Sequence, residues 1–489
     1  MRIKLIANSI EAKNYISSLD QNGCDYAYFH GLKNNENLTT DNSWELKVFS
    51  KIENTFFKNS ISENSKQTIN QIYKAVNNLE QLLEKENPVH LDGMKVFLNV
   101  DSTFNNFLKL STTSFEKVSK AYFSKFKRGL DDNSGEMLPS SKSLILGISL
   151  FKEDNKHRPF MSTMINKLGI EKATQFVINH EASHSFEFTN FKTEGFVWKE
   201  GITDLVISMK QLKQVSVQNE NKSIMDSMNE EIKTEHSNKF PLIDVDFIKE
   251  CTILNSELYA DLSAVLLMRN DSIKQNNYSF TKTKNLIDVV TEGRRKEHEN
   301  ALSSELSFNP SVKYFHHCTV TGLDHLKSIL KEIPEMVLTQ QDIYKIIIEA
   351  QHVGMSRVFI AASLADKKYY DQLELIANID YNSQEKILEL PQKINPQKTA
   401  DFSQKIIQTA GKDWYLSFKN KIKDIENLDI YNKSQAIWNA AINPPLYEQF
   451  IQDNKLAIEK YKALNSITKI MEKNYRPIEG LTIQKRAIK

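Results

Sequence analysis

One segment of the chain, HEASH at residues 180–184, has the residue types and spacing that metal chemistry requires. Apolar residues before it recur at helical spacing, which predicts a helix with His180 and His184 on its buried face. Two imidazoles four residues apart lie one helical turn from each other, so both can bind one ion about 2.0–2.1 Å away. Glu181 lies about 100° around the helix and can reach a water on that ion without binding the ion. The pattern predicts one Zn2+ per chain with Glu181 as general base; the alternative is two buried histidines that only pack.

A hydrolytic zinc site uses three protein ligands and keeps its fourth position open, so the chain must supply one more ligand. SELYAD offers Glu257 and Asp261 within an apolar helical run, where unpaired carboxylates are unfavourable. We expect Glu257 to bind the metal and Asp261 to orient a ligand histidine. KEGITD offers Glu200 and Asp204 at the same spacing, but Glu200 lies near a predicted helix start, where an acidic side chain also complements the helix dipole. Glu257 is the preferred third ligand and Glu200 the alternative.

From His180 to about Asn270 the chain resembles the gluzincin metallopeptidases, in which HExxH on one helix is completed by a glutamate from a later helix. SELYAD looks like the ExxAD form of that second helix, and KEGITD looks like the EGxxD form with a shorter spacer. The resemblance implies a zinc peptidase, a hydrolase that binds a peptide or protein substrate as an extended chain along an edge strand. LILGISLF at 144–151 or MKVFLNV at 94–100 would supply that strand.

The same resemblance implies a downstream His, Tyr or Arg that stabilises the oxyanion formed when water attacks the carbonyl. YFHHCT gathers Tyr314, His316 and His317 in a short stretch. We expect His317 to be this catalytic residue and Tyr314 to be the second choice, with His316 also open and packing or surface roles as the alternative. Arg294 and Arg295, in EGRRKEHE, are interpreted as part of a solvated helix face.

The predicted fold class is α+β, mostly helical, with a zincin-like metallopeptidase core that contains a small mixed sheet. An α+β region at 1–135 precedes this catalytic domain at 136–330, and a helical region at 331–489 follows it. The first boundary depends on GLDDNSGEMLPSSKS, which is rich in residues that favour loops. Short apolar runs of strand length lie at 3–6, 94–100 and 144–151.

The 489-residue chain carries 63 Lys and Arg against 62 Asp and Glu, a formal net charge of +1. Without a strong positive field, nucleic acid is not an expected partner. No run approaches the roughly 18 consecutive apolar residues of a membrane span, so no membrane-spanning segment is expected.

Cys24, Cys251 and Cys318 are too few and too far apart for a disulfide framework, which favours a reducing compartment. The N-terminus lacks the apolar core of a secretory signal. We therefore expect a cytoplasmic protein, or an effector exported by a non-classical route, of undetermined oligomeric state.

The preferred function is hydrolysis of peptide bonds by a metal-activated water, with Glu181 taking the proton and returning it to the leaving amine. One alternative is a zincin-like metal-binding interaction protein whose helical C-terminal region is the active part. The intact Glu181 disfavours that alternative, because a binding protein has no need of a general base. A second alternative is a non-peptide zinc hydrolase that acts on another amide or ester.

Overall fold

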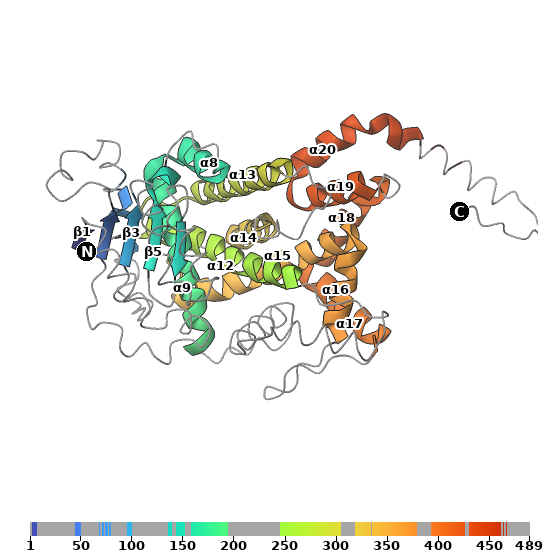
Figure 1. Ribbon diagram of the computed structural model, residues 1–489, viewed down its shortest axis with the longest axis horizontal. Helices are drawn as coiled ribbons and strands as arrows, with labels where there is room; N and C mark the ends of the chain where they lie inside the picture. The colour runs from blue at the N-terminus through green and yellow to red at the C-terminus, as the bar shows by residue number, and fades with distance from the viewer. Residues whose placement is uncertain are drawn as a thin grey trace, which may run out of the picture.

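The computed structural model describes the helices and strands of the chain with short adjoining stretches. The described residues are 2–6, 45–49, 68, 71–72, 74–76, 78–79, 95–99, 135–138, 143–151, 158–193, 245–304, 318–333, 335–378, 393–425, 430–460, 463 and 466. Figure 1 shows the strands at one end of the molecule, the C-terminal helices at the other end, and long helices between them.

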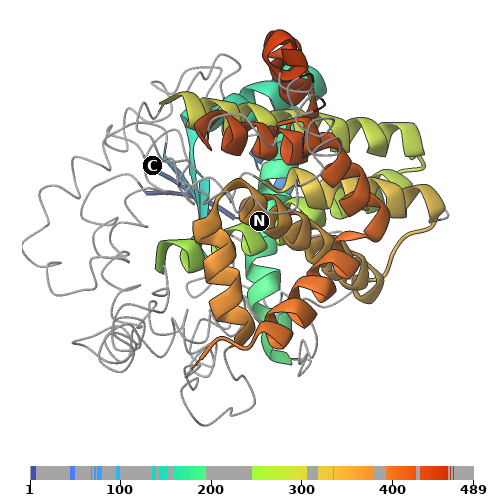
Figure 2. The ribbon, with the colours of Figure 1, turned by 90° about the vertical axis from the view of Figure 1, so that its right-hand side faces the viewer.

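Helices make up most of the described chain. The helices that carry or surround the segments 180–184 and 257–261 are α8 (Pro159–Leu168), α9 (Ile170–Thr193), α12 (Val245–Lys274), α13 (Phe280–Ser304) and α14 (Val320–Glu332). They are followed by α15 (Gln340–Ala365), α16 (Lys367–Asn378), α17 (Pro396–Ala410), α18 (Lys412–Ile422), α19 (Ile430–Ile442) and α20 (Pro444–Asp453), with 3-10 helices at Ile148–Phe151 and Lys423–Ile425. Figure 2, a view along the long axis, shows the C-terminal helices nearest the viewer. Within the described residues, no helix combines the length and apolar character that crossing a membrane requires.

The described strands all precede α8, and helical residues between 68 and 79 lie between β2 and β3. The strands are β1 (Arg2–Ile6), β2 (Glu45–Phe49), β3 (Lys95–Asn99), β4 (Gly135–Leu138) and β5 (Ser143–Gly147). They pair in the order β1-β2-β3-β5-β4, with β4 antiparallel to β5 and the other pairs parallel. Because β3 and β5 each have a neighbour on both sides, neither MKVFLNV nor LILGISLF supplies the expected edge strand.

The predicted fold class, an α+β protein whose zincin-like core contains a small mixed sheet, is wrong. The part of the chain that packs into a defined core is mostly helical. Among the strand residues, only Leu144 and Leu146 have described side chains in that core. The physical reason is that the long helices bury their apolar faces against one another, with α9 on α12, α8 on α13 and α14 on α15. Short apolar runs in the sequence carry no information about which partner covers them.

The helices bury two hydrophobic clusters that meet on α12. The first joins α8, α9, α13 and the second half of α12, and it includes Phe176 and Leu262. The second joins the first half of α12 to α15 and the later helices, and it includes Leu258 and Phe359. The two carboxylates of SELYAD therefore lie on α12 at the junction of both clusters.

The division into regions 1–135, 136–330 and 331–489 stays a prediction. The boundary near 330 falls inside α14, and α15 packs on α12. Gln351 on α15 donates from Nε2 to the main-chain oxygen of Asn255 on α12 at 2.7 Å. The first helix after the boundary therefore contacts the helix that carries Glu257.

Helices α14 and α15 cross where both have glycine. A Cβ atom on Gly354 would lie 3.0 Å from both N and Cα of Gly322 and 3.1 Å from Cδ2 of Leu258.

We expect Gly354→Ala to lower the free energy of unfolding by about 1–2 kcal/mol, because overpacking against backbone outweighs the gain in helix propensity. Urea denaturation measures this change. Lys345→Ala, at an exposed position of the same helix, is the control and should stay within about 0.5 kcal/mol of the unsubstituted protein. An equally stable Gly354→Ala protein would contradict the packing at this crossing.

Candidate metal centre

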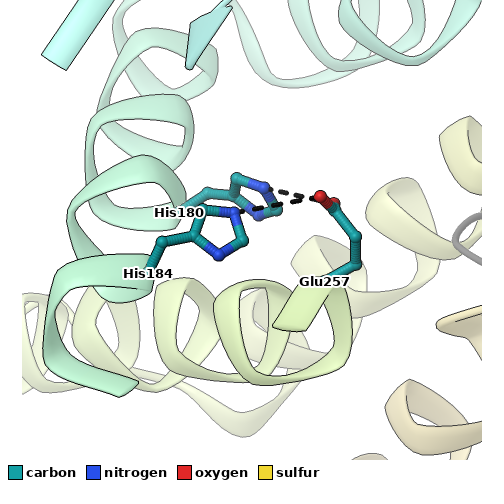
Figure 3. A group of neighbouring side chains, drawn as sticks. All are labelled: His180, His184 and Glu257. Atoms are coloured by element: carbon teal, nitrogen blue, oxygen red, sulfur yellow. Dashed lines mark ion pairs between the residues drawn. The ribbon is translucent and has the colours of Figure 1, made fainter. Parts of the chain in front are cut away.

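Helices α9 and α12 bring His180, His184 and Glu257 together, as Figure 3 shows. Nε2 of His180 lies 3.4 Å from Oε2 of Glu257, and Nε2 of His184 lies 3.9 Å from Oε1. One possible ligand atom from each residue lies within 4.8 Å of the others. Ligand atoms 2.0–2.1 Å from a tetrahedral zinc are about 3.3 Å apart. The separations in the structure are somewhat longer than this, and the three residues are of types that could hold a metal ion.

The two histidines lie on the face of α9 that packs on α12. His180 is 8% exposed, and its ring lies stacked near that of Phe176 at a centroid distance of 6.1 Å. One turn later, His184 is partly exposed, and its ring meets that of His180 edge to face at 5.0 Å. Glu181, next to His180, is partly exposed as well. This arrangement places two imidazoles at the border between the buried core and the surface.

Polar groups from α12 contact the other ring nitrogen of each histidine. Nδ1 of His180 lies 2.9 Å from Oδ1 of Asp261, which is fully buried. Nδ1 of His184 lies 3.0 Å from Oγ of Ser256. Contacts at Nδ1 direct Nε2 of both rings toward Glu257. The structure thus places Asp261 beside a candidate ligand histidine, where the sequence argument expects it.

A buried arginine from α13 joins this cluster. Arg294 donates to both oxygens of Asp261, from Nε at 2.8 Å and from Nη2 at 2.7 Å. Its Nη2 also lies 3.2 Å from Oε2 of Glu257, and its guanidinium carbon lies 4.5 Å from the ring centre of Phe160. Thr319, which precedes α14, donates to Asp261 at 2.7 Å. The interpretation of Arg294 as part of a solvated face is wrong, because the residue is only 7% exposed.

Burial and charge act on the pKa values of this cluster in opposite directions. Burial lowers the pKa of His180, but its contacts with Asp261 and Glu257 raise the pKa to about 10. Burial raises the pKa of Asp261, whereas the charge of Arg294 and the contact with His180 lower it to about 2. Burial also raises the pKa of Glu257, and contact with His180 and the charge of Arg294 bring it well below the usual value. The metal-free centre therefore holds two carboxylates, an arginine and a protonated His180 at neutral pH.

The raised pKa of His180 predicts that the metal-free protein loses stability in alkaline solution. The usual pKa of 6.5 applies to the unfolded chain, so the stabilising contribution is complete below pH 6.5 and is lost as pH rises through about 10. We expect the free energy of unfolding of chelator-treated protein to fall by a few kcal/mol over this window. Urea denaturation across the window measures the fall. The control is His180→Gln, which should remove most of the pH dependence; equal slopes in both proteins would refute the prediction.

Several residues predicted from the sequence lie outside the described residues. They are the alternative ligand Glu200 with its neighbour Asp204, and the oxyanion candidates Tyr314, His316 and His317. Their roles stay predictions, and the candidate ligands and their described partners lie on α9, α12 and α13 and at Thr319.

Sequence reasoning missed Arg294 and Thr319. On α13, Ile287, Val290 and Arg294 recur at intervals of three and four residues and are all buried, so this spacing marks Arg294 as part of the buried face. The neighbouring Arg295 is partly buried, and its Nε donates to a main-chain oxygen of α19 at 3.0 Å. No local pattern marks Thr319, which is 58 residues from its partner on α12.

No protein-family model matches the chain, and no match was found among curated proteins or solved structures. Relatives therefore add no functional information to the geometry. The function has to be argued from the chemistry of His180, His184, Glu257 and the residues around them.

Proposed function

We propose that the protein is a zinc-dependent metallopeptidase with a gluzincin-type ligand set, which hydrolyses peptide bonds using Glu181 as general base. The observation that carries the proposal is the approach of Nε2 of His180 and Nε2 of His184 to one carboxylate, that of Glu257, at 3.4 and 3.9 Å. Imidazole nitrogen and carboxylate oxygen are ligands that zinc binds in hydrolytic sites. The term gluzincin refers here to an HExxH motif completed by a glutamate from a later helix, and not to the fold.

The charges around these ligands also support a divalent cation. Glu257, Asp261 and Glu297 each contact Arg294, so three carboxylates share one guanidinium. Buried charges require ionic partners, hydrogen bonds or a metal. A bound Zn2+ would add positive charge beside the carboxylate of Glu257.

The residues of the chain have separate tasks in the proposed reaction. His180, His184 and Glu257 would hold a zinc ion, which when bound would act as a Lewis acid toward the attacking water and the scissile carbonyl. Glu181 accepts a proton from that water on its carboxylate and passes it to the leaving nitrogen. Asp261 and Ser256 contact Nδ1 of the two histidines and thereby hold the rings in orientation. Glu181 and His184 are partly exposed, so we expect a substrate to approach from this side of the cluster.

A peptide library prepared from a whole proteome tests the proposed activity. The zinc-loaded protein is incubated with the library, and new peptide termini are identified by mass spectrometry. We expect new termini with the zinc-loaded protein, their loss after a chelator removes zinc, and their return when zinc is restored. Zinc-loaded protein that produces no new termini would contradict the peptidase proposal. The same experiment with simple esters and non-peptide amides tests the alternative hydrolase.

A further inference from the structure

Arg294 connects all three carboxylates of the cluster. Its Nη1 lies 3.1 Å from Glu297, and its Nη2 lies 2.7 Å from Asp261 and 3.2 Å from Glu257. Its Nε donates to the second oxygen of Asp261 at 2.8 Å. A guanidinium presents its donors in a rigid planar fork. One side chain therefore contacts all three carboxylates at the same time.

Packing around Arg294 leaves the guanidinium little room to move. Its carbon lies 4.5 Å from the ring centre of Phe160 on α8. Gly293, the preceding residue, allows this approach, because a Cβ atom there would lie 2.7 Å from Cδ2 of Phe160. Helix α8 can thus lie directly on α13 and cover the guanidinium. Arg294 is held from one side by an aromatic ring and from the other by carboxylates.

We propose that Arg294 is a positioning residue that limits Glu257 to one oxygen for the metal ion; this inference rests on the proposed function. Oε2 of Glu257 accepts from Nη2 of Arg294 and lies 3.4 Å from Nε2 of His180. Oε1, which Arg294 does not contact, lies 3.9 Å from Nε2 of His184 and is the oxygen that we assign to the ion. A glutamate that binds through one oxygen gives, with two histidines, three ligand atoms and an open fourth position for water. A glutamate that binds through both oxygens fills that position or raises the coordination number.

A purely structural role for Arg294 makes a different prediction. Neutralising the buried Asp261 requires a positive charge, which lysine also provides. Holding Asp261 and Glu257 at the same time requires the fork of a guanidinium, because an ammonium group acts as a point charge. Lysine at this position therefore separates support of the fold from positioning of the ligand.

The test compares Arg294→Lys and Arg294→Met with Arg295→Lys as the matched control. Arg295 is the next residue on α13, and its Nε donates to the main-chain oxygen of Ile442. Zinc affinity is measured by competition with a chelator, and the geometry of the site by the visible spectrum of the Co2+-substituted protein. We expect both Arg294 variants to bind zinc about 10–100-fold more weakly. The visible absorption of Co2+ in these two variants should be weaker than in the unsubstituted protein, because Co2+ with more than four ligands absorbs less strongly than tetrahedral Co2+. Arg295→Lys should match the unsubstituted protein in both measurements.

Each outcome bears on the positioning role. The positioning role would be overturned if Arg294→Lys had the same zinc affinity and the same Co2+ spectrum as the unsubstituted protein. If Arg294→Met fails to fold, Arg294→Lys alone decides the question. If neither variant folds, Arg294 supports the fold rather than the ligand, and the inference also fails. Absence of zinc from the unsubstituted protein would instead contradict the proposed function itself, so the two failures are distinguishable.

Discussion

Glu181→Gln is expected to keep its zinc and to lose peptide hydrolysis by a factor of about 10²–10⁴ or more. Glutamine has nearly the shape of glutamate but cannot accept a proton from the attacking water. The ligands His180, His184 and Glu257 are untouched by this change, so the free energy of zinc binding should change little. Zinc content by mass spectrometry and rates of peptide cleavage measure the two quantities on one preparation.

The matched control for this substitution is Glu171→Gln, on the same helix α9. Glu171 is exposed and pairs with Lys74 at 3.0 Å, away from the histidines. Its replacement should leave zinc content and cleavage rate unchanged, since exposed ion pairs contribute about 1 kcal/mol or less. A Glu181→Gln protein that cleaves peptides at the unsubstituted rate would remove Glu181 from the mechanism. Cleavage lost together with zinc would show that the glutamate acts on the metal site instead.

Glu257→Gln is expected to weaken zinc binding by more than about 100-fold and to abolish hydrolysis. The substitution removes the only charged ligand in the proposed set. It keeps an amide oxygen that can still accept a hydrogen bond from Arg294, so the fold should survive. Zinc affinity measured by chelator competition gives the size of the loss, and circular dichroism checks the fold.

Glu200→Gln is the paired experiment, because Glu200 is the alternative third ligand suggested by KEGITD. We expect this variant to bind zinc with the affinity of the unsubstituted protein. If Glu200→Gln loses zinc and Glu257→Gln retains it, the assignment of the third ligand is wrong, although a zinc site would remain. If neither loses zinc, the ligand set is wrong as a whole.

The parts of the site that sequence could predict are those with local patterns. The helical spacing before HEASH places His180 and His184 on one buried face, and that face packs on α12 in the structure. SELYAD carries Glu257 and Asp261 one turn apart, so a single helix face brings both to the histidines. In each case the spacing of the residues along one helix decides where their side chains point.

The parts that sequence could not predict depend on contacts between distant segments. Arg294 lies in a highly charged stretch typical of a solvated face, yet its partner Asp261 is 33 residues away on another helix. The fold class fails for a similar reason. The apolar run 144–151 contains the strand β5, as its length predicts, but it does not indicate that the core is built mainly from helices packed on one another. Only tertiary packing shows that the long helices cover one another and that Arg294 lies among carboxylates.

The most direct test of the central claim is anomalous X-ray diffraction at the zinc absorption edge from crystals of the zinc-loaded protein. We expect one anomalous peak per chain, about 2.0–2.2 Å from Nε2 of His180, Nε2 of His184 and a carboxylate oxygen of Glu257. A structure without a peak between these residues, or with the only peak on other ligands, would contradict it.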